Sequence, residues 1–171
     1  MYTLLLFPYI GEFSIDIMEA QANLFTIREV NISYWPSKEL IKAPKIHSSK
    51  TAYDYLFNAF TQQSMAVKEE FNVLLLNRAN KPIGVYRMST GGIDSTVVDV
   101  RLLMTAALKS LATGMILSHN HPSGQLSASD GDLRVTANIK KACKIMDISL
   151  LDHLILDPFG GYMSFADEGL L

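Results

Sequence analysis

The residues best suited to chemistry are two histidines separated by one position, His119 and His121, with Ser129 and Asp132 downstream. On an extended chain, residues i and i+2 face the same way, so both imidazoles can reach one ion while Asn120 points elsewhere. Asp132 falls in the first turn of a predicted helix, where its carboxylate can return toward the imidazoles. Two imidazoles and one carboxylate leave a fourth position vacant, which is the arrangement of catalytic rather than structural zinc.

Ser129 and Asp132 also have a purely structural interpretation. Ser129 is a good helix N-cap, and Asp132 stands three positions further on, as in a capping box. An isolated H-x-H is, by itself, more often incidental than metal-binding. The joint pattern, H-x-H at the end of a strand and S-x-x-D at the start of the next helix, favours the metal site, and both interpretations can hold together.

The string H-x-H-x7-S-x2-D resembles the JAMM (MPN+) metallopeptidase motif at every spacing. Three further segments resemble the RadC family within that superfamily: HNHPSG at 119–124, LLDHLIL at 150–156 and SFADEG at 164–169. The resemblance covers residues 48–171. It implies an α/β fold of the JAMM/MPN (cytidine-deaminase-like) type, a three-layer sandwich in which helices flank a central mixed sheet.

The resemblance also implies a role for each residue of the motif. One Zn²⁺ would be held by His119, His121 and Asp132, and Ser129 would stabilise the oxyanion of a tetrahedral intermediate. Such an ion lowers the pKa of a water ligand to about 7 and polarises a substrate carbonyl.

The resemblance further implies a glutamate upstream as general base, and two glutamates stand at that place. Glu69 and Glu70 open an apolar strand, so their side chains leave it on opposite faces. Both faces read as buried, and the alternation alone therefore does not choose between them. Family members tend to show E-x-F, which ends here at Phe71 and favours Glu69.

The leading functional hypothesis is a zinc-dependent hydrolase, a metallopeptidase that cleaves an amide or isopeptide bond in an unidentified protein or peptide. The alternative is a DNA-repair-associated accessory that processes or binds nucleic acid, with a structural or nucleolytic metal. Many RadC relatives carry an N-terminal helix-hairpin-helix module, and we expect none before residue 48. A scaffold without catalysis is disfavoured because the ligands and Glu69 are all retained. A homo-oligomer stays open.

Composition and charge restrict these functions. The formal net charge is -2, with 15 basic and 17 acidic residues, so any nucleic-acid contact should be weak and local. Cys143 is the one cysteine, which excludes an intramolecular disulfide and a thiolate-rich zinc site. The apolar start of segment 1–17 lacks the features of a signal peptide. No apolar run approaches the roughly 20 residues that span a bilayer, so we expect a cytoplasmic protein without membrane contact.

The sequence predicts an N-terminal extension, residues 1–47, followed by the RadC-like domain at 48–171. The extension holds a bulged strand at 24–34 and a linker rich in proline and lysine that runs through 35–50. In the domain we expect a helix capped by Ser48 or Ser49 whose apolar stripe is Tyr53, Leu56, Phe57 and Phe60. A second helix should run from a cap at Asp99 through Leu111, with Gly114 just past its end. The other expected elements are strands at 71–77, 83–88, 115–118, 149–156 and 162–165, and a helix at 130–146.

Three features outside the motif remain to be interpreted. His153 is either a satisfied core residue or a support for a metal ligand, which metal sites commonly need. Asp152, its neighbour, should face the other side of the strand. Lys140, Lys141 and Lys144 form a basic stripe on one helix, which is usually only a solvated face.

Overall fold

The structure is a computed structural model that describes residues 44–91 and 98–171. The predicted strand at 24–34 and most of the linker lie outside the described residues, and the division at residue 48 stays a prediction. The described elements are α2 (Ser49–Phe57), the 3-10 helix η1 (Gln62–Ser64), β1 (Glu70–Leu76), β2 (Pro82–Thr90), α3 (Val100–Lys109), β3 (Gly114–Asn120), α4 (Asp130–Ile145), β4 (Ser149–Leu156) and β5 (Tyr162–Ser164).

The strands form one mixed sheet in the order β2-β1-β3-β4-β5. Strand β3 pairs in parallel with β4, whereas β1–β2, β1–β3 and β4–β5 are antiparallel pairs. Helix α4 makes the crossover between the two parallel strands, as a parallel connection requires. Because β1 and β3 are antiparallel, the carboxyl end of β3 lies beside the amino end of β1, with His119 opposite Phe71.

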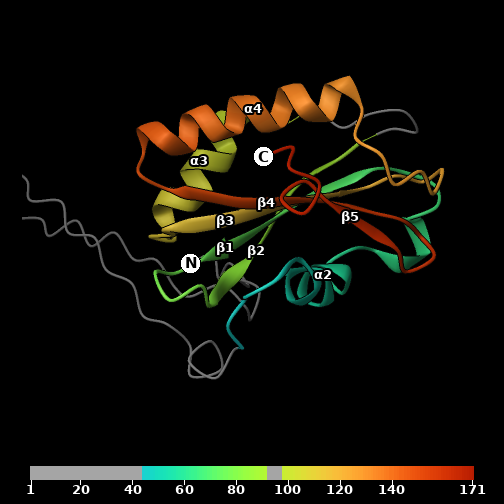
Figure 1. Cartoon of the computed structure of the whole chain (residues 1–171), viewed down its shortest axis with the longest axis horizontal. Helices are drawn as coiled ribbons and strands as arrows, with labels where there is room; N and C mark the ends of the chain where they lie inside the picture. The colour runs from blue at the N-terminus through green and yellow to red at the C-terminus, as the bar shows by residue number, and fades with distance from the viewer. Residues whose placement is uncertain (1–43, 92–97) are drawn as a thin grey trace, which may run out of the picture.

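Helices cover both faces of the sheet and make three layers (Figure 1). On one face, α3 and α4 pack through Leu103 and Ile139 against the β1 residues Phe71 and Val73. On the other face, α2 packs through Leu56 against Leu74 and its neighbours. Every residue of β1 is buried, because alternate residues enter opposite cores. The predicted three-layer α/β sandwich is confirmed.

Helix α2 confirms the predicted cap and most of the predicted stripe. The Ser48 side chain accepts a hydrogen bond from the Thr51 amide at the helix start. Tyr53 and Leu56 are buried, and Phe57 is half-buried. Phe60 is also buried but lies beyond the end of the helix.

The end of α3 differs from the prediction. Helix α3 stops at Lys109, and Leu111 takes a left-handed conformation with φ 53°. The Ala112 amide then donates to the Ala107 carbonyl, so these residues terminate the helix without a glycine. Gly114 instead opens β3, which continues two residues beyond the expected end and includes His119 and Asn120. No helix within the described residues is both long and apolar enough to cross a bilayer.

Candidate metal centre

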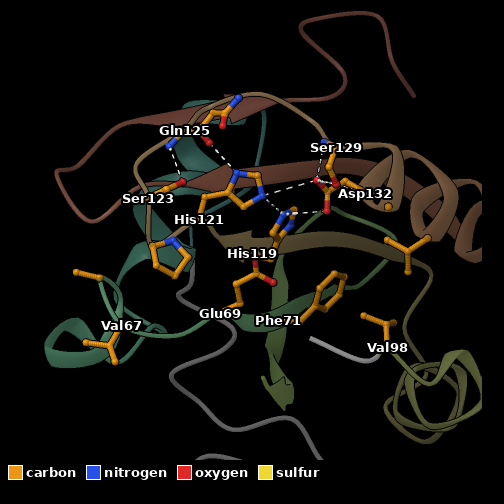
Figure 2. Close-up of a pocket in the computed structure, with 14 residues that line it drawn as sticks. Val67, Glu69, Phe71, Val98, His119, His121, Ser123, Gln125, Ser129 and Asp132 are labelled. Atoms are coloured by element: carbon orange, nitrogen blue, oxygen red, sulfur yellow. Dashed lines mark hydrogen bonds and ion pairs between the residues drawn. The ribbon is translucent and has the colours of Figure 1, made fainter. Parts of the chain in front are cut away.

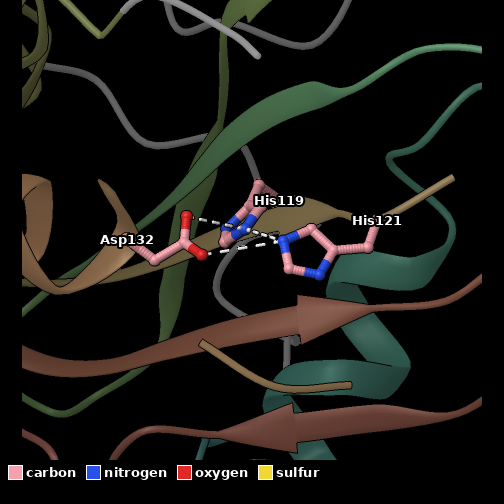
Figure 3. Close-up of side chains that lie close together, drawn as sticks. All are labelled: His119, His121 and Asp132. Carbon is pink, nitrogen blue, oxygen red and sulfur yellow. Dashed lines mark hydrogen bonds and ion pairs between the residues drawn. The ribbon is translucent and has the colours of Figure 1, made fainter. Parts of the chain in front are cut away.

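The two histidines leave β3 on one face, as an extended chain requires. His119 is the penultimate residue of β3. The His121 amide donates to the Leu156 carbonyl at 2.9 Å, which continues the pairing with β4 past the end of the strand. The Nε2 atoms of His119 and His121 lie 3.0 Å apart. One ligand atom from each histidine and one from Asp132 all lie within 4.8 Å of one another (Figure 3).

Asp132 reaches this point because it belongs to the first turn of α4. Ser129 is the N-cap, and its hydroxyl accepts from the Asp132 amide at 3.2 Å while Asp132 Oδ2 accepts from the Ser129 amide at 2.8 Å. Asp132 Oδ1 lies 3.1 Å from His119 Nε2, and Oδ2 lies 3.7 Å from His121 Nε2. The capping box thus holds the carboxylate against the imidazoles, so the structural role is present in the same geometry that brings the three donors together.

A chain of hydrogen bonds fixes which nitrogen of His119 carries its proton. The Thr136 hydroxyl donates to the Asp132 carbonyl at 2.6 Å, so its oxygen accepts from His153 Nδ1 at 2.7 Å. His153 Nε2 is then unprotonated and accepts from His119 Nδ1 at 2.8 Å. Burial lowers the pKa of His153 well below its usual value, which keeps the ring neutral. The lone pair of His119 therefore lies on Nε2, toward Asp132.

His121 is oriented in the same sense by a backbone group. Its Nδ1 donates to the Gln125 carbonyl at 2.7 Å, which leaves Nε2 to face His119 and Asp132. A hydrogen bond to Asp132 is the main cause of a raised pKa at His121, and the Glu69 charge adds to it. Burial acts to raise the pKa of Asp132, but the hydrogen bonds that His119 and His121 donate when their Nε2 atoms carry a proton outweigh it and hold that pKa far below its usual range. The site therefore favours positive charge between the three side chains.

The donor set fits a divalent metal ion. Two Nε2 lone pairs and a carboxylate converge on one point, and their second nitrogens are held by other groups, as ligating histidines require. An N₂O set of three protein ligands is a catalytic zinc set, because it leaves a position for water or substrate. His119, His121 and Asp132 can thus hold a metal ion.

The donors face a cavity of about 880 Å³ that also separates the two glutamates. Glu69 lines this cavity and lies beside His119 (Figure 2). The Glu70 carboxylate instead accepts from the Thr61 amide at 3.2 Å and the Ser64 hydroxyl at 2.9 Å, and Glu70 is absent from the lining. The two glutamates leave the chain on opposite sides, as predicted, but β1 begins at Glu70, so Glu69 lies one residue before the strand. Glu69 is the one near the donors.

Ser129 also lines the cavity, but its hydroxyl already has a partner. It donates to Asp132 Oδ2 at 2.7 Å. The hydroxyl would have to turn away from this carboxylate to stabilise an oxyanion. The oxyanion role of Ser129 therefore stays a prediction.

The structure decides the open interpretations of the neighbouring residues. His153 is fully buried and contacts a candidate ligand, so it is both a satisfied core residue and a support for His119. Asp152 faces away from it and accepts from Ser164 and from the Ala166 amide.

Thr136 and the Gln125 carbonyl were not predicted, since no local pattern marks either. The basic stripe Lys140, Lys141 and Lys144 is exposed on α4.

A mixed α/β sandwich with an H-x-H pair at a strand end and a helix-borne aspartate defines the JAB/MPN class of domain. A family model described as a RadC-like JAB domain matches residues 46–170, and the chain belongs to this family. It is 44% identical over 134 residues, 78% of its length, to a UPF0758 protein of Flavobacterium johnsoniae. It is 42% identical over 136 residues, 80% of its length, to a UPF0758 protein of Porphyromonas gingivalis. The matched regions are 57% and 59% of those proteins, so the chain spans less than two thirds of either.

Proposed function

We propose that the protein is a zinc-dependent hydrolase of the JAMM type that cleaves an amide or isopeptide bond in a protein or peptide. The observation that carries this proposal is the placement of Glu69 in the cavity onto which the three donor side chains open. A general base that is not itself a ligand is what metal-assisted amide hydrolysis needs beside an open metal position.

The chain's own residues account for the steps as follows. The ion, when bound, activates a water and polarises the substrate carbonyl. Glu69 takes the proton of the attacking water and returns it to the nitrogen of the leaving amine. Ser129, after turning from Asp132, donates to the oxygen of the tetrahedral intermediate.

The walls of the cavity favour a peptide over a nucleic acid. The described lining includes the apolar side chains of Val67, Phe71, Val98 and Val135, and its acids are Glu69 and Asp132. No lysine or arginine is among these described lining residues. Phosphate contacts rely on such cations, so a phosphodiester would find little to neutralise it here.

A matched pair of variants tests the proposal. Glu69→Gln should keep its fold and its zinc but lose hydrolysis by about 10²-fold or more, because only the base is removed. Glu70→Gln should stay active, since its carboxylate faces the segment around Ser64 and not the cavity.

The assay uses quenched-fluorescence peptides, an isopeptide probe that joins a C-terminal glycine to a lysine ε-amine, and single- and double-stranded DNA. Cleavage of a peptide or isopeptide probe by the wild-type protein and by Glu70→Gln, but not by Glu69→Gln, supports the proposal. Metal-dependent cleavage of DNA alone, or full activity of Glu69→Gln, would overturn it.

A further inference from the structure

Asn120, the residue between the two candidate ligands, points away from the metal centre into the protein. Its side chain is fully buried. Oδ1 accepts from the Glu70 amide at 2.7 Å. Nδ2 donates to the Met65 carbonyl at 2.7 Å and to the Lys68 carbonyl at 3.0 Å. Asn120 thus joins the strand that carries His119 to a segment that lies 50 to 55 positions earlier in the sequence.

These three bonds need an asparagine in one orientation. A backbone amide can only donate and a carbonyl can only accept, so the partners themselves fix which side-chain atom is oxygen and which is nitrogen. An aspartate would place a buried negative charge against two carbonyl oxygens. An alanine would leave the Glu70 amide and two carbonyls without these partners.

The bonds from Asn120 hold the backbone on both sides of Glu69. Lys68 precedes it and Glu70 follows it, and the Glu69 carbonyl accepts from the Gly91 amide at 2.9 Å. Residues 65–69 lie between the end of η1 and the start of β1 and belong to no helix or strand. Glu69 thus lies just outside β1, and the side chain of Asn120 holds the backbone on both sides of it.

We infer that Asn120 is a positioning residue that fixes the Glu69 carboxylate at its distance from the metal ligands. The inference rests on the proposed function, in which Glu69 is the general base. His119 and His121 are the neighbours of Asn120 in sequence, and their side chains leave β3 on the opposite side. One three-residue stretch of chain therefore orients both the metal ligands and the base, which couples their geometry.

The first test measures backbone protection and zinc affinity together in Asn120→Ala. Hydrogen exchange of the Glu70 amide and the 65–69 segment should become roughly tenfold faster or more, because their anchoring bonds are gone. Zinc affinity, from competition with a fluorescent chelator, should stay within about threefold, since Asn120 contributes no donor to the ion. Wild-type exchange rates in this segment would overturn the inference whatever the activity assays show.

Asn72→Ala is the matched control. Asn72 is also a buried asparagine, on the adjacent strand β1, and its Nδ2 has no hydrogen-bond partner within the described parts of the chain. Its truncation removes the same atoms from the core of the sheet, and unlike Asn120 it has no hydrogen bond through Nδ2 to segment 65–69. If Asn72→Ala speeds exchange there as much as Asn120→Ala does, the effect is general loosening and the inference fails.

A double-mutant cycle gives the readout that a purely structural role would not move. On the isopeptide or peptide probe that the wild-type protein cleaves, Asn120→Ala should lower kcat by roughly 10- to 100-fold and leave KM nearly unchanged. In the Glu69→Gln background the same substitution should have almost no further effect, because the residue it positions is already disabled. Independent, multiplicative losses would overturn the inference. Full activity of Glu69→Gln alone would instead overturn the proposed function, and the exchange result would still decide whether Asn120 anchors the segment.

Discussion

Replacing Thr136 by valine removes one hydroxyl from the chain of hydrogen bonds behind the metal centre while keeping the shape of the side chain. In the wild-type protein that hydroxyl accepts from His153 Nδ1 at 2.7 Å and donates to the Asp132 carbonyl at 2.6 Å. Without it, the fully buried His153 must either leave Nδ1–H unpaired or move its proton to Nε2. In the second case His119 has to carry its own proton on Nε2, the atom that faces Asp132.

Both outcomes weaken metal binding, and their magnitude follows from the lost contact. An unpaired buried donor costs about 1–3 kcal/mol, so the free energy of unfolding of the metal-free protein should fall by that amount. Loss of a residue that supports a ligating histidine lowers metal affinity by about 10- to 100-fold. We expect both effects in Thr136→Val.

Chelator competition measures the zinc affinity, and urea unfolding in the presence of a chelator measures the stability. Nitrogen-15 NMR of labelled histidine reports which ring nitrogen of His119 and of His153 is protonated. Thr105→Val is the control, because the Thr105 hydroxyl makes the same bond to the carbonyl four residues earlier, on α3 away from the site. If Thr136→Val binds zinc as tightly as Thr105→Val does, the hydrogen-bond chain does not orient His119.

Three further predictions follow from the site and its surroundings. Ser129→Ala should lower the unfolding free energy by about 1 kcal/mol, because the helix cap is lost. If Ser129 also stabilises the oxyanion, turnover of the probe that the wild-type protein cleaves should fall by roughly 10²-fold. The wild-type protein should lose stability relative to His153→Gln as pH falls below about 6.5, by up to about 1.4 kcal/mol per pH unit. The reason is that His153 binds a proton in the unfolded state at such pH, whereas its burial in the folded state lowers its pKa and excludes that proton. Urea unfolding of metal-free protein at several pH values measures that slope, and a constant difference would contradict it. Binding to a DNA oligonucleotide should be weak and should fall steeply with salt; tight, salt-insensitive binding would favour the nucleic-acid alternative.

The sheet and the convergence of the three donor side chains were predictable because their signals are local. The continuous apolar run at 71–76 predicts a strand buried on both faces, and alternate residues of β1 do enter the two cores. The spacing of His119 and His121 places both on one side of an extended chain, whatever the rest of the fold. The capping box and the approach of Asp132 to the imidazoles are compatible, because the same helix start that places Asp132 in the cap also directs its carboxylate to His119 and His121.

The contacts that support the site could not be assigned from the sequence, because each joins residues far apart in it. For His153 the sequence left a core role and a support role both open. His153 meets His119 across two parallel strands, and Asn120 meets the 65–70 segment across an antiparallel pair. Side-chain alternation could not select Glu69 over its neighbour, since the apolar sequence that follows predicts burial on both sides of the strand. The end of α3 was misplaced for a similar reason: Leu111 adopts the left-handed conformation that a glycine usually takes, so Gly114 was a misleading signal.

Metal analysis of the purified protein tests the central claim most directly, namely that His119, His121 and Asp132 hold one zinc ion. The protein, dialysed against buffer stripped of metals and reloaded with zinc, should contain about one zinc per chain by elemental analysis, as expected for a single three-ligand site. The double variant His119→Ala/His121→Ala, with its fold checked by circular dichroism, should contain almost none. Undiminished zinc in that folded double variant, or no zinc in the wild-type protein, would contradict the account.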